Sequence, residues 1–472
     1  MKTTPWRPWA LAFFLGTSLA SAEQCRLQYK QSTTVSAGAN VIPYSSGAAS
    51  SSLPTPASST QSGSTSTPSA TPFNYGNQTI RGVNLGGWFV LEPWITPSIF
   101  ENTNNNNIVD EYTFGSLQDY DQALTVLEEH WDTWITEDDF AAINAAGLNH
   151  VRIPLGYWSV PMTSSDTNSG TSVSPYIPGA WQYLLRALNW AKTHDVHVIL
   201  DLHGAPGSQN GYDNSGQRTS NPQWGSNATD VARTVDTVKY IAQHIGGMID
   251  VLELLNEAAG FTSSAWAAVI RQFFQDGYDA VREVAPSGMK IMIGDAFLTV
   301  DAWTNFLTAP NGTGVMMDYH EYQIFSDDEL SRSLDEHVSF ACTHIPDLTS
   351  FAHSNLWTVL GEWSNAPTDC AQWLNGRGVG ARWDGTIAAN SQYFGSCNGW
   401  TGSSGNFSDE YKTFLRKYWE VQVEVGEAVQ GWVFWTWKAE NADEWSYQKG
   451  LEGGWTILQI DYIQTLVHRN IA

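Results

Sequence analysis

The chain has 472 residues, of which 42% are hydrophobic and 15% are charged, so it can bury a large core and is not disordered as a whole. Asp and Glu number 48 against 23 Lys and Arg, which gives a formal net charge of −25. Because such an acidic surface repels polyanions, we expect neither nucleic acid nor an anionic membrane surface as a partner. The 23 Trp residues fit either a Trp-rich core or a cleft that stacks flat, neutral rings.

The N-terminus has the features of a secretory signal peptide. Lys2 and Arg7 precede an apolar run at residues 9–20, and small residues before Glu23 form a cleavage site. The run is too short to cross a bilayer, and no later apolar stretch reaches the length of about 18 residues that a span needs. We therefore expect a signal peptide at residues 1–22, a secreted, extracellular product and no membrane span.

Residues 23–72 differ in composition from the rest of the chain. From Ser32 to Pro72 they are mainly Ser, Thr, Ala, Gly and Pro, with hardly any large apolar side chains. Such a segment cannot offset its ordering entropy by burial, so we expect it to be disordered, either as a glycosylated stalk or as a flexible tail. Four Asn-x-Ser/Thr sequons also predict a glycosylated surface: Asn77, Asn227, Asn311 and Asn406.

From residue 73 to residue 472, short apolar runs alternate with longer helical stretches, a pattern typical of βα units. Eight runs are expected to be strands: residues 79–87, 150–155, 197–204, 251–257, 290–296, 315–322, 356–364 and 429–438. Three of the intervening helices are expected at residues 137–146, 181–193 and 265–284. Eight nearly continuous apolar runs favour one α/β domain, a (β/α)8 TIM barrel with loop insertions, over a doubly wound open sheet.

Polar and aromatic residues gather where these strands are expected to end, and that end of a (β/α)8 barrel carries the chemistry. They are Arg152, His203, Asn256, Glu257, His320, Tyr322, Glu362, Trp435 and Trp437. Strands four and seven lie across the barrel from each other, so Glu257 and Glu362 can approach to about 5–5.5 Å. At that separation, one carboxylic acid protonates a glycosidic oxygen and the other carboxylate forms a covalent glycosyl intermediate. The sequence therefore predicts a glycoside hydrolase that retains the anomeric configuration.

The other strand-end groups suit the same chemistry. Asn256 can hydrogen-bond a sugar 2-hydroxyl, and Arg152 can keep the seventh-strand glutamate ionised. Tyr322 can donate to that same carboxylate, and Trp437 can stack beneath the reacting sugar. Two further groups are expected to bind sugar hydroxyls or to orient the carboxylates: His203 and His320.

Seven segments carry a resemblance to a known family, and the longest reads Asp-Leu-His-Gly-Ala-Pro-Gly-Ser-Gln-Asn-Gly. They are residues 81–88, 91–93, 151–154, 201–211, 254–257, 361–364 and 434–438. Over residues 79–450 the chain resembles the fungal exo-β-1,3-glucanases of glycoside hydrolase family 5. The resemblance implies a secreted or cell-wall enzyme that releases glucose from the non-reducing ends of β-1,3-glucan. It also implies that Glu257 is the acid/base and Glu362 the nucleophile.

The resemblance assigns binding residues as well. It implies that Glu92 binds the outer hydroxyls of the terminal glucose and that Tyr212 and Phe325 clamp the next sugar. The subsite for the terminal glucose would be completed by Arg152, His203, Asn256, His320, Tyr322 and Trp437. Three positions depart from the family pattern. Tyr212 and Ala258 replace a Phe and a Pro, and Glu321 adds a charge that we expect to point away from the site.

The four cysteines are too few for a disulfide scaffold. Cys370 and Cys397 lie in the same insertion after the seventh strand, and we expect a disulfide between them. Cys25 and Cys342 then either pair with each other or stay free. The sequence has no Cys-x-x-Cys pair, no His-Glu-x-x-His motif and no Walker loop, so we expect neither a metal nor a cofactor.

Two other kinds of function remain open. An endo-β-1,6- or mixed-linkage β-glucanase, or a glucan transferase, would use the same glutamate pair in an open groove. A non-catalytic wall-binding protein would keep the stacking Trp residues, but it has no need of both Glu257 and Glu362. In each case the partner is a β-glucan polysaccharide or oligosaccharide, and we expect the protein to be a monomer.

Overall fold

The computed structural model describes Cys25, residues 71–285 and residues 288–457. The predicted signal peptide at residues 1–22 and, apart from Cys25, the Ser/Thr-rich segment up to residue 70 lie outside the described residues. The boundaries of these two segments stay predictions. Among the helices of the described ranges, none has both the length and the apolar composition needed to cross a membrane.

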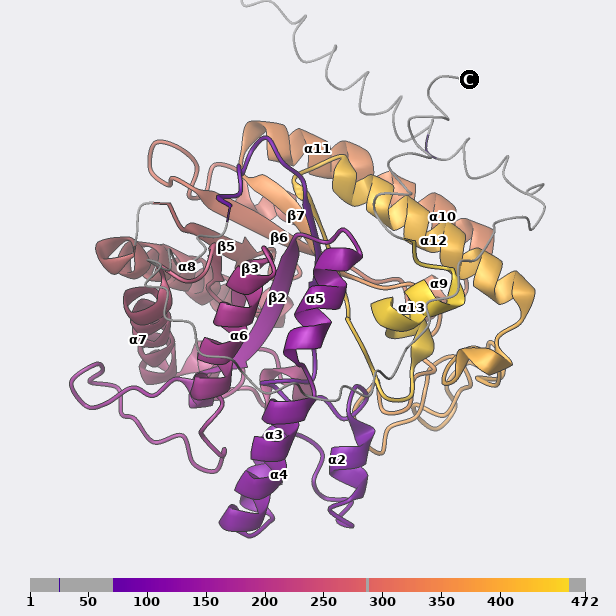
Figure 1. Ribbon diagram of the computed structural model, residues 1–472, viewed down its shortest axis with the longest axis horizontal. Helices are drawn as coiled ribbons and strands as arrows, with labels where there is room; N and C mark the ends of the chain where they lie inside the picture. Colours follow the sequence, from indigo (N-terminus) through magenta and orange to yellow (C-terminus); the bar gives the residue numbers. More distant parts are fainter. Residues whose placement is uncertain (1–24, 26–70, 286–287, 458–472) are drawn as a thin grey trace, which may run out of the picture.

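Eight parallel strands form a closed barrel at the centre of the molecule (Figure 1). Each strand pairs with the next along the chain, and the last pairs with the first. The strands are β1 (Ile80–Asn84), β2 (His150–Gly156), β3 (His197–Gly204), β4 (Val251–Glu253), β5 (Lys290–Gly294), β6 (Val315–Glu321), β7 (Trp357–Trp363) and β8 (Gly431–Phe434). The predicted (β/α)8 barrel is confirmed, and closure of the sheet rules out the doubly wound alternative.

Helices surround the barrel. They are α2 (Pro97–Glu101), α3 (Glu111–Ser116), α4 (Tyr120–Thr133), α5 (Glu137–Ala145), α6 (Trp181–Thr193), α7 (Ala228–Ile245), α8 (Ser264–Val284), α9 (Asp327–Leu330), α10 (Leu334–Ala341), α11 (Ile345–Ser354), α12 (Asp409–Glu427) and α13 (Tyr447–Gly453). In Figure 1, α7 and α8 pack together on one flank and α10 and α12 on the opposite flank. Helices α2, α3 and α4 belong to the long connection between β1 and β2 and extend from one side of the barrel.

The local sequence explains where the helices begin. Helix α8 starts after Ser263, whose side-chain oxygen accepts a hydrogen bond from the backbone N–H of Trp266 at 3.1 Å. Its apolar residues recur at helical spacing, so the face that includes Ile270, Phe274 and Val281 is buried. Helix α6 has the predicted bounds, and α5 and α8 each differ from the prediction by one residue at one end.

Six of the eight strands are shorter than the sequence predicted, and β4 and β8 are two of those that differ most. Strand β4 ends at Glu253 rather than at residue 257, and β8 occupies only the middle of the predicted 429–438 run. Beyond both strands the chain leaves the sheet, and at Glu257 the backbone φ is 44°, a value that strand residues do not adopt. The apolar run continues past β4 because Leu254 and Leu255 are also buried, although they follow the end of the strand.

The barrel interior has two layers. The lower layer, toward the amino ends of the strands, consists of apolar side chains: Ile80, Ile199, Val251, Met292, Met316, Val359 and Val433. Two positions further along β3, β4 and β6, the buried residues are Asp201, Glu253 and Asp318. Because alternate residues of a strand face the same side, these carboxylates form an upper layer directly between the apolar layer and the mouth of the barrel.

Two disulfides are present. Cys370 pairs with Cys397 at a Cα separation of 5.4 Å, which confirms the bond predicted within the insertion between β7 and α12. Cys25 pairs with Cys342, which lies 317 residues later and directly follows α10. The second bond ties the N-terminal part of the chain to the outside of the barrel.

Candidate active site

A cavity of about 460 Å³ opens at the carboxyl ends of the strands. Four carboxylates line it: Glu92, Asp213, Glu257 and Glu362. Eight aromatic rings line it as well: Trp94, Tyr212, Phe261, Phe297, Tyr322, Phe325, Trp435 and Trp445. Apolar rings with a few polar groups between them suit a ligand that has both flat apolar faces and hydrogen-bonding hydroxyls.

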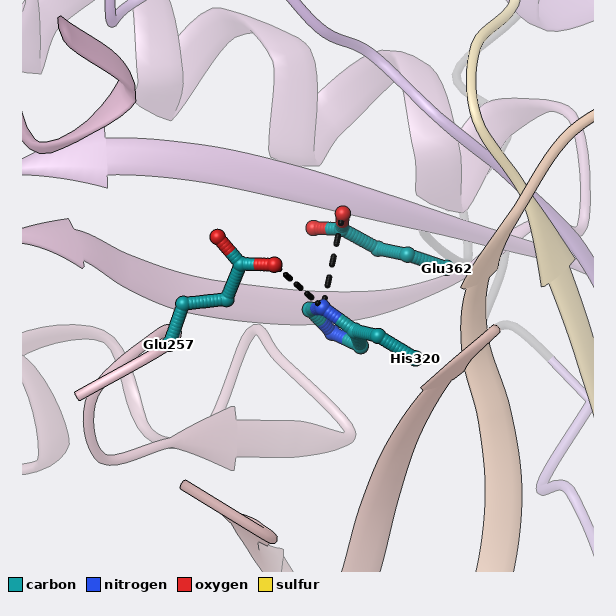
Figure 2. A group of neighbouring side chains, drawn as sticks. All are labelled: Glu257, His320 and Glu362. Carbon is teal, nitrogen blue, oxygen red and sulfur yellow. Dashed lines mark hydrogen bonds and ion pairs between the residues drawn. The ribbon is translucent and has the colours of Figure 1, made fainter. Parts of the chain in front are cut away.

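Glu257 and Glu362 point toward one another, with His320 between them (Figure 2). Glu257 lies on the loop after β4, and Glu362 lies near the end of β7, so the two come from opposite sides of the barrel. One carboxylate oxygen of each and a ring nitrogen of His320 all lie within 4.8 Å of one another. The closed barrel therefore brings together two carboxylates that are far apart in the sequence.

Both oxygens of Glu362 accept hydrogen bonds. Nη1 of Arg152 donates to Oε1 at 2.8 Å, and the hydroxyl of Tyr322 donates to Oε2 at 3.0 Å. Burial raises the pKa of Glu362, while the positive charges of His320 and Arg152 oppose that increase. The two donors fix both the position and the orientation of this carboxylate.

Glu257 has different donors. Nδ2 of Asn214, on the loop after β3, donates to Oε2 at 2.8 Å, and Nδ1 of His320 lies 2.9 Å from Oε1. Burial alone would raise the pKa of Glu257, but the hydrogen bond and the charge of His320 outweigh it, so the pKa is lowered. The positive φ of Glu257 is uncommon for a residue with a side chain, and such strained positions concentrate at functional sites.

His320 contacts three carboxylates. Its Nδ1 lies 2.9 Å from Glu257 and 3.5 Å from Glu362, and its Nε2 lies 3.1 Å from Asp318. Burial opposes its charge, yet the carboxylates raise the pKa of His320 well above its usual value. The ligand atoms of Glu257, His320 and Glu362 are close enough for a metal ion, and they are equally close enough to share a proton through hydrogen bonds. This cluster is therefore suited to hold a proton.

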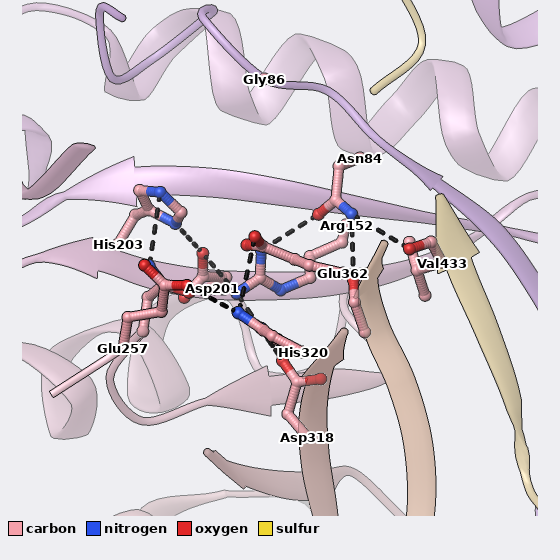
Figure 3. A network of polar contacts seen from close by, with 12 residues as sticks. Asn84, Gly86, Arg152, Asp201, His203, Glu257, Asp318, His320, Glu362 and Val433 are labelled. Atoms are coloured by element: carbon pink, nitrogen blue, oxygen red, sulfur yellow. Dashed lines mark hydrogen bonds and ion pairs between the residues drawn. The ribbon is translucent and has the colours of Figure 1, made fainter. Parts of the chain in front are cut away.

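Arg152 lies at the centre of a fully buried polar network behind the two glutamates (Figure 3). Besides Glu362, its guanidinium reaches Glu253 at 2.7 Å, Asn256 at 2.8 Å, Asn84 at 3.0 Å, Asp201 at 3.1 Å and Asp318 at 3.7 Å. Burial opposes the charge, but the surrounding carboxylates raise the pKa of Arg152 well above its usual value. The upper layer of the barrel is thus organised around one permanent positive charge.

An irregularity in the pairing of β6 with β7 places His320 beside Glu362. The register shifts between Tyr319 and His320, so that Gly361 has no partner and Glu362 pairs with His320. A Cβ atom on Gly361 would lie 1.7 Å from Oδ1 of Asp318, so only glycine fits this position.

Two of the cavity carboxylates each have an oxygen without a partner. Glu92 accepts a hydrogen bond from Nε1 of Trp94 at 3.0 Å through Oε2, whereas its buried Oε1 has no partner among the described residues. Within the same part of the chain, the buried Oδ2 of Asp213 has no partner either. Burial raises the pKa of Glu92 well above its usual value and that of Asp213 to about 7. Buried polar atoms that line a cavity without a partner are candidates to bind ligand hydroxyls.

The comparisons with known proteins identify the family. More than half of the chain, residues 110–400, matches the model described as cellulase (glycosyl hydrolase family 5). The chain therefore belongs to glycosyl hydrolase family 5. It is 43% identical to a glucan 1,3-beta-glucosidase of Blumeria graminis over 389 residues, which cover 81% of this chain and 87% of the relative. It is 44% identical to glucan 1,3-beta-glucosidase 2 of Wickerhamomyces anomalus over 389 residues, with 80% and 87% covered.

A solved structure shares the fold. The crystal structure of rutinosidase from Aspergillus niger superposes with a TM-score of 0.60 at 19% sequence identity, covering 82% of this chain and 99% of that one. As a member of glycosyl hydrolase family 5, the protein is a glycoside hydrolase with a (β/α)8 barrel.

Most of the residues predicted for the site lie together. Six line the cavity: Glu92, Tyr212, Glu257, Tyr322, Phe325 and Glu362. Four lie directly behind them: Arg152, His203, Asn256 and His320. Two of the departures from the family pattern are also located. Ala258 is buried next to Glu257, and Glu321 faces away from the site as expected, with Oε2 lying 3.1 Å from Nε2 of His344.

The placement of Trp437 beneath the sugar was wrong. Trp437 does not line the cavity; its Nε1 donates to Oδ1 of Asp139 on α5 at 2.8 Å, and its ring packs against Tyr447. Trp435 lines the cavity instead and stacks on His203, with ring centroids 5.7 Å apart. Because β8 ends at Phe434, neither ring lies on a regular strand, and the alternation of strand faces could not distinguish them.

The sequence interpretation missed several functional groups. Asp201 and Asp318 each stand two positions before a predicted site histidine, so alternation along the strand could have placed both of them inside the barrel. Asp213 and Asn214 lie on the irregular loop after β3, where no periodicity applies. The only sequence feature that could have indicated a role for Asp213 and Asn214 is their position just after the long motif at residues 201–211.

Proposed function

We propose that the protein is a secreted, retaining exo-β-1,3-glucosidase that removes glucose from the non-reducing ends of β-1,3-glucan. The observation that carries this proposal is that carboxylate oxygens of Glu257 and Glu362 lie within 4.8 Å of each other. Retaining glycosidases hold their two carboxyl groups about 5–5.5 Å apart, whereas inverting enzymes need about 6.5–9.5 Å to admit a water. The names of the curated relatives support glucan as the substrate, and the two disulfides support secretion.

In the proposed reaction, Glu362 attacks the anomeric carbon while Glu257 protonates the glycosidic oxygen. The bond to the leaving sugar breaks, the leaving sugar takes the proton, and a glucosyl ester of Glu362 remains. A water molecule then attacks the same carbon, Glu257 accepts its proton, and glucose leaves in the β configuration.

The hydrogen bonds of the two carboxylates support this division of roles, whereas the lowered pKa of Glu257 and the raised pKa of Glu362 favour the opposite one. Arg152 and Tyr322 fix both oxygens of Glu362, as a nucleophile requires. The surrounding carboxylates raise the pKa of His320, and in its protonated form His320 donates from Nδ1 to Oε1 of Glu257 at 2.9 Å. Transfer of that proton along the hydrogen bond supplies Glu257 with the acid form needed for the first step, and the second step returns it.

The terminal glucose would lie above the glutamates, with its outer hydroxyls toward the unpaired oxygens of Glu92 and Asp213. Oδ1 of Asn256 accepts a hydrogen bond from Arg152 at 2.8 Å, which orients its Nδ2 group toward the 2-hydroxyl. Trp435 would supply an apolar surface for the sugar ring. Each of these groups recognises hydroxyls or flat rings, and none requires a charged ligand.

The insertion between β7 and α12 supports exo action. It contributes five residues to the cavity wall: Leu374, Asn375, Val379, Arg382 and Ile387. Its position is fixed by the Cys370–Cys397 bond and by Arg218 of the β3 loop, which donates to the carbonyl oxygen of Arg377 at 3.1 Å. If this wall closes one end of the cavity, the cavity admits a chain end and excludes the middle of a chain.

Analysis of the early products from laminarin, a β-1,3-glucan, tests the proposed function. We expect glucose as the first soluble product, released as the β anomer in NMR spectra recorded before mutarotation. Early oligosaccharides would instead indicate endo action or glucan transfer, and initial α-glucose would contradict retention. Pustulan, a β-1,6-glucan, is the matched substrate control, and faster hydrolysis of pustulan would contradict the proposed linkage.

A further inference from the structure

Two phenylalanine rings stand at the outer part of the cavity, on neighbouring loops. Phe261 belongs to the short 3₁₀ helix Gly260–Thr262 after β4, and Phe297 lies on the loop after β5. Their ring centroids are 5.5 Å apart in an edge-to-face arrangement. The rings are 56% and 42% exposed although both line the cavity. Two neighbouring apolar rings in contact with water gain free energy when a ligand covers them.

Exposed phenylalanines are confined to this cavity in the described part of the chain. There are three of them, Phe261, Phe297 and Phe325, and all three line it. Random surface exposure would scatter such rings over the molecule. Their common position therefore indicates selection for contact with a ligand.

The backbone holds the pair rigidly. The N–H of Gly260 donates to the carbonyl oxygen of Ala296 at 3.1 Å, which joins the two loops directly behind the rings. A Cβ atom on Gly260 would lie 2.6 Å from that oxygen, so only glycine allows this approach. Ala296 and Phe297 have φ values of 56° and 58°, which are strained for residues other than glycine. Rings held in fixed positions lose little entropy when they bind a ligand.

The position of Glu257, the proposed general acid, determines which sugar of the substrate contacts these two rings. This step rests on the proposed function. A general acid must contact the oxygen of the leaving group, so the leaving-group sugars extend from Glu257 over the loop that carries it. Phe261 lies on that loop, four residues after Glu257. If Tyr212 and Phe325 hold the first leaving-group sugar, Phe261 is available to the next one.

We propose that Phe261 is a specificity-determining residue whose ring stacks against the second leaving-group sugar of a β-1,3-glucan chain. Phe297 supports it edge-on from the neighbouring loop. The enzyme accordingly prefers chains of at least three glucose units to the disaccharide, because only the longer chains reach this ring.

The ratio of kcat/KM for laminaritriose to kcat/KM for laminaribiose tests this inference, because the two substrates differ by the one sugar that would reach Phe261. We expect Phe261→Ala to lower this ratio about tenfold, and Phe261→Trp to restore most of it. The matched control is Tyr120→Ala, because Tyr120 is similarly exposed, at 50%, but does not line the cavity. Tyr120→Ala should leave both rate constants unchanged.

The outcomes separate this inference from the proposed function. If the unaltered enzyme releases no glucose from either oligosaccharide, the proposed function fails, and the role of Phe261 fails with it. If the enzyme is active but Phe261→Ala leaves the ratio unchanged, only the role of Phe261 is overturned. An equal loss on both substrates also overturns it, because the ring would then act at the site of bond cleavage or on folding.

Discussion

The lower layer of the barrel interior consists of apolar side chains, whereas the upper layer consists of Arg152 and the carboxylates around it. Both layers are buried, and both are built from inward positions of the same strands. Residues such as Ile199 and Val251 stabilise the fold through the apolar area that they remove from water. In the upper layer each charge must instead recover its desolvation penalty through its partners.

The difference indicates what each layer is for. A buried ion-pair network contributes little net stability compared with apolar side chains of the same volume. The upper layer is nevertheless directly connected to the proposed catalytic groups, because Arg152 contacts Glu362 and Asp318 contacts His320. We infer that the lower layer maintains the barrel and that the upper layer positions and charges the catalytic groups.

The largest effect is expected for the carboxylates themselves. Glu362→Gln should lower kcat on laminarin at least about 10⁴-fold, equivalent to about 5 kcal/mol of activation free energy, because an amide cannot form the glucosyl ester. Glu257→Gln should also be strongly impaired on laminarin. It should still form the glucosyl enzyme from 2,4-dinitrophenyl β-glucoside, whose leaving group needs no protonation, and stopped-flow measurement of the dinitrophenolate burst checks this.

The control for these two variants is Glu283→Gln, because the Glu283 side chain is 69% exposed and, within the described ranges, forms an ion pair with Lys239 alone. Glu283→Gln should retain the full activity of the unaltered enzyme. A dinitrophenolate burst from Glu362→Gln but not from Glu257→Gln would show that the roles of the two glutamates are reversed.

Breaking the upper layer at its centre should cost stability as well as activity. Arg152→Met leaves Asp201, Glu253 and Asp318 buried without their common cation, and we expect the free energy of unfolding to fall by about 3–5 kcal/mol. Urea denaturation followed by tryptophan fluorescence measures this loss. The matched control is Lys239→Met on the surface, which should change the free energy by no more than about 0.5 kcal/mol. Equal stability of Arg152→Met and the unaltered protein would contradict an organising role for the arginine.

Both the strands of the barrel and the catalytic candidates at their ends could be predicted from the sequence. The strands were recognisable because parallel strands buried on both faces form nearly continuous apolar runs, and β3 has the predicted bounds. The catalytic candidates were recognisable because they follow such runs. The same reasoning extended β4 to residue 257, because the buried Leu254 and Leu255 after the strand continue its apolar pattern.

Features that depend on three-dimensional contacts left little trace in the sequence. The choice of Trp435 over Trp437 depends on how the chain leaves β8, and the pairing of Cys25 with Cys342 spans 317 residues. Asn214 and Phe261 lie in single 3₁₀ turns within loops, which are too short for helical or strand periodicity to indicate which way a side chain points. Loops without periodicity therefore hold most of the specificity that sequence reasoning missed.

The smallest expected effect concerns how the stability of each layer depends on pH. Glu257, Asp318 and Glu362 face His320 and raise its pKa in the folded protein. Its stabilisation is therefore fully present below about pH 6.5, the usual value for an unfolded chain, and is lost as the pH rises through the folded value. The stability cost of His320→Gln should accordingly shrink above pH 6.5, by at most about 1.4 kcal/mol per pH unit.

Ile199→Val in the lower layer supplies the comparison for this pH series. It removes one buried methylene from a layer without charges, so it should cost about 1 kcal/mol at every pH. Urea denaturation of both variants and the unaltered protein between pH 5.5 and 9.5 gives the two curves. A cost of His320→Gln as independent of pH as that of Ile199→Val would mean that the imidazole has the same pKa in the folded and unfolded protein, so that it is neutral above about pH 6.5. Glu257 would then have to obtain its proton from solvent, because His320 would not hold one beside it.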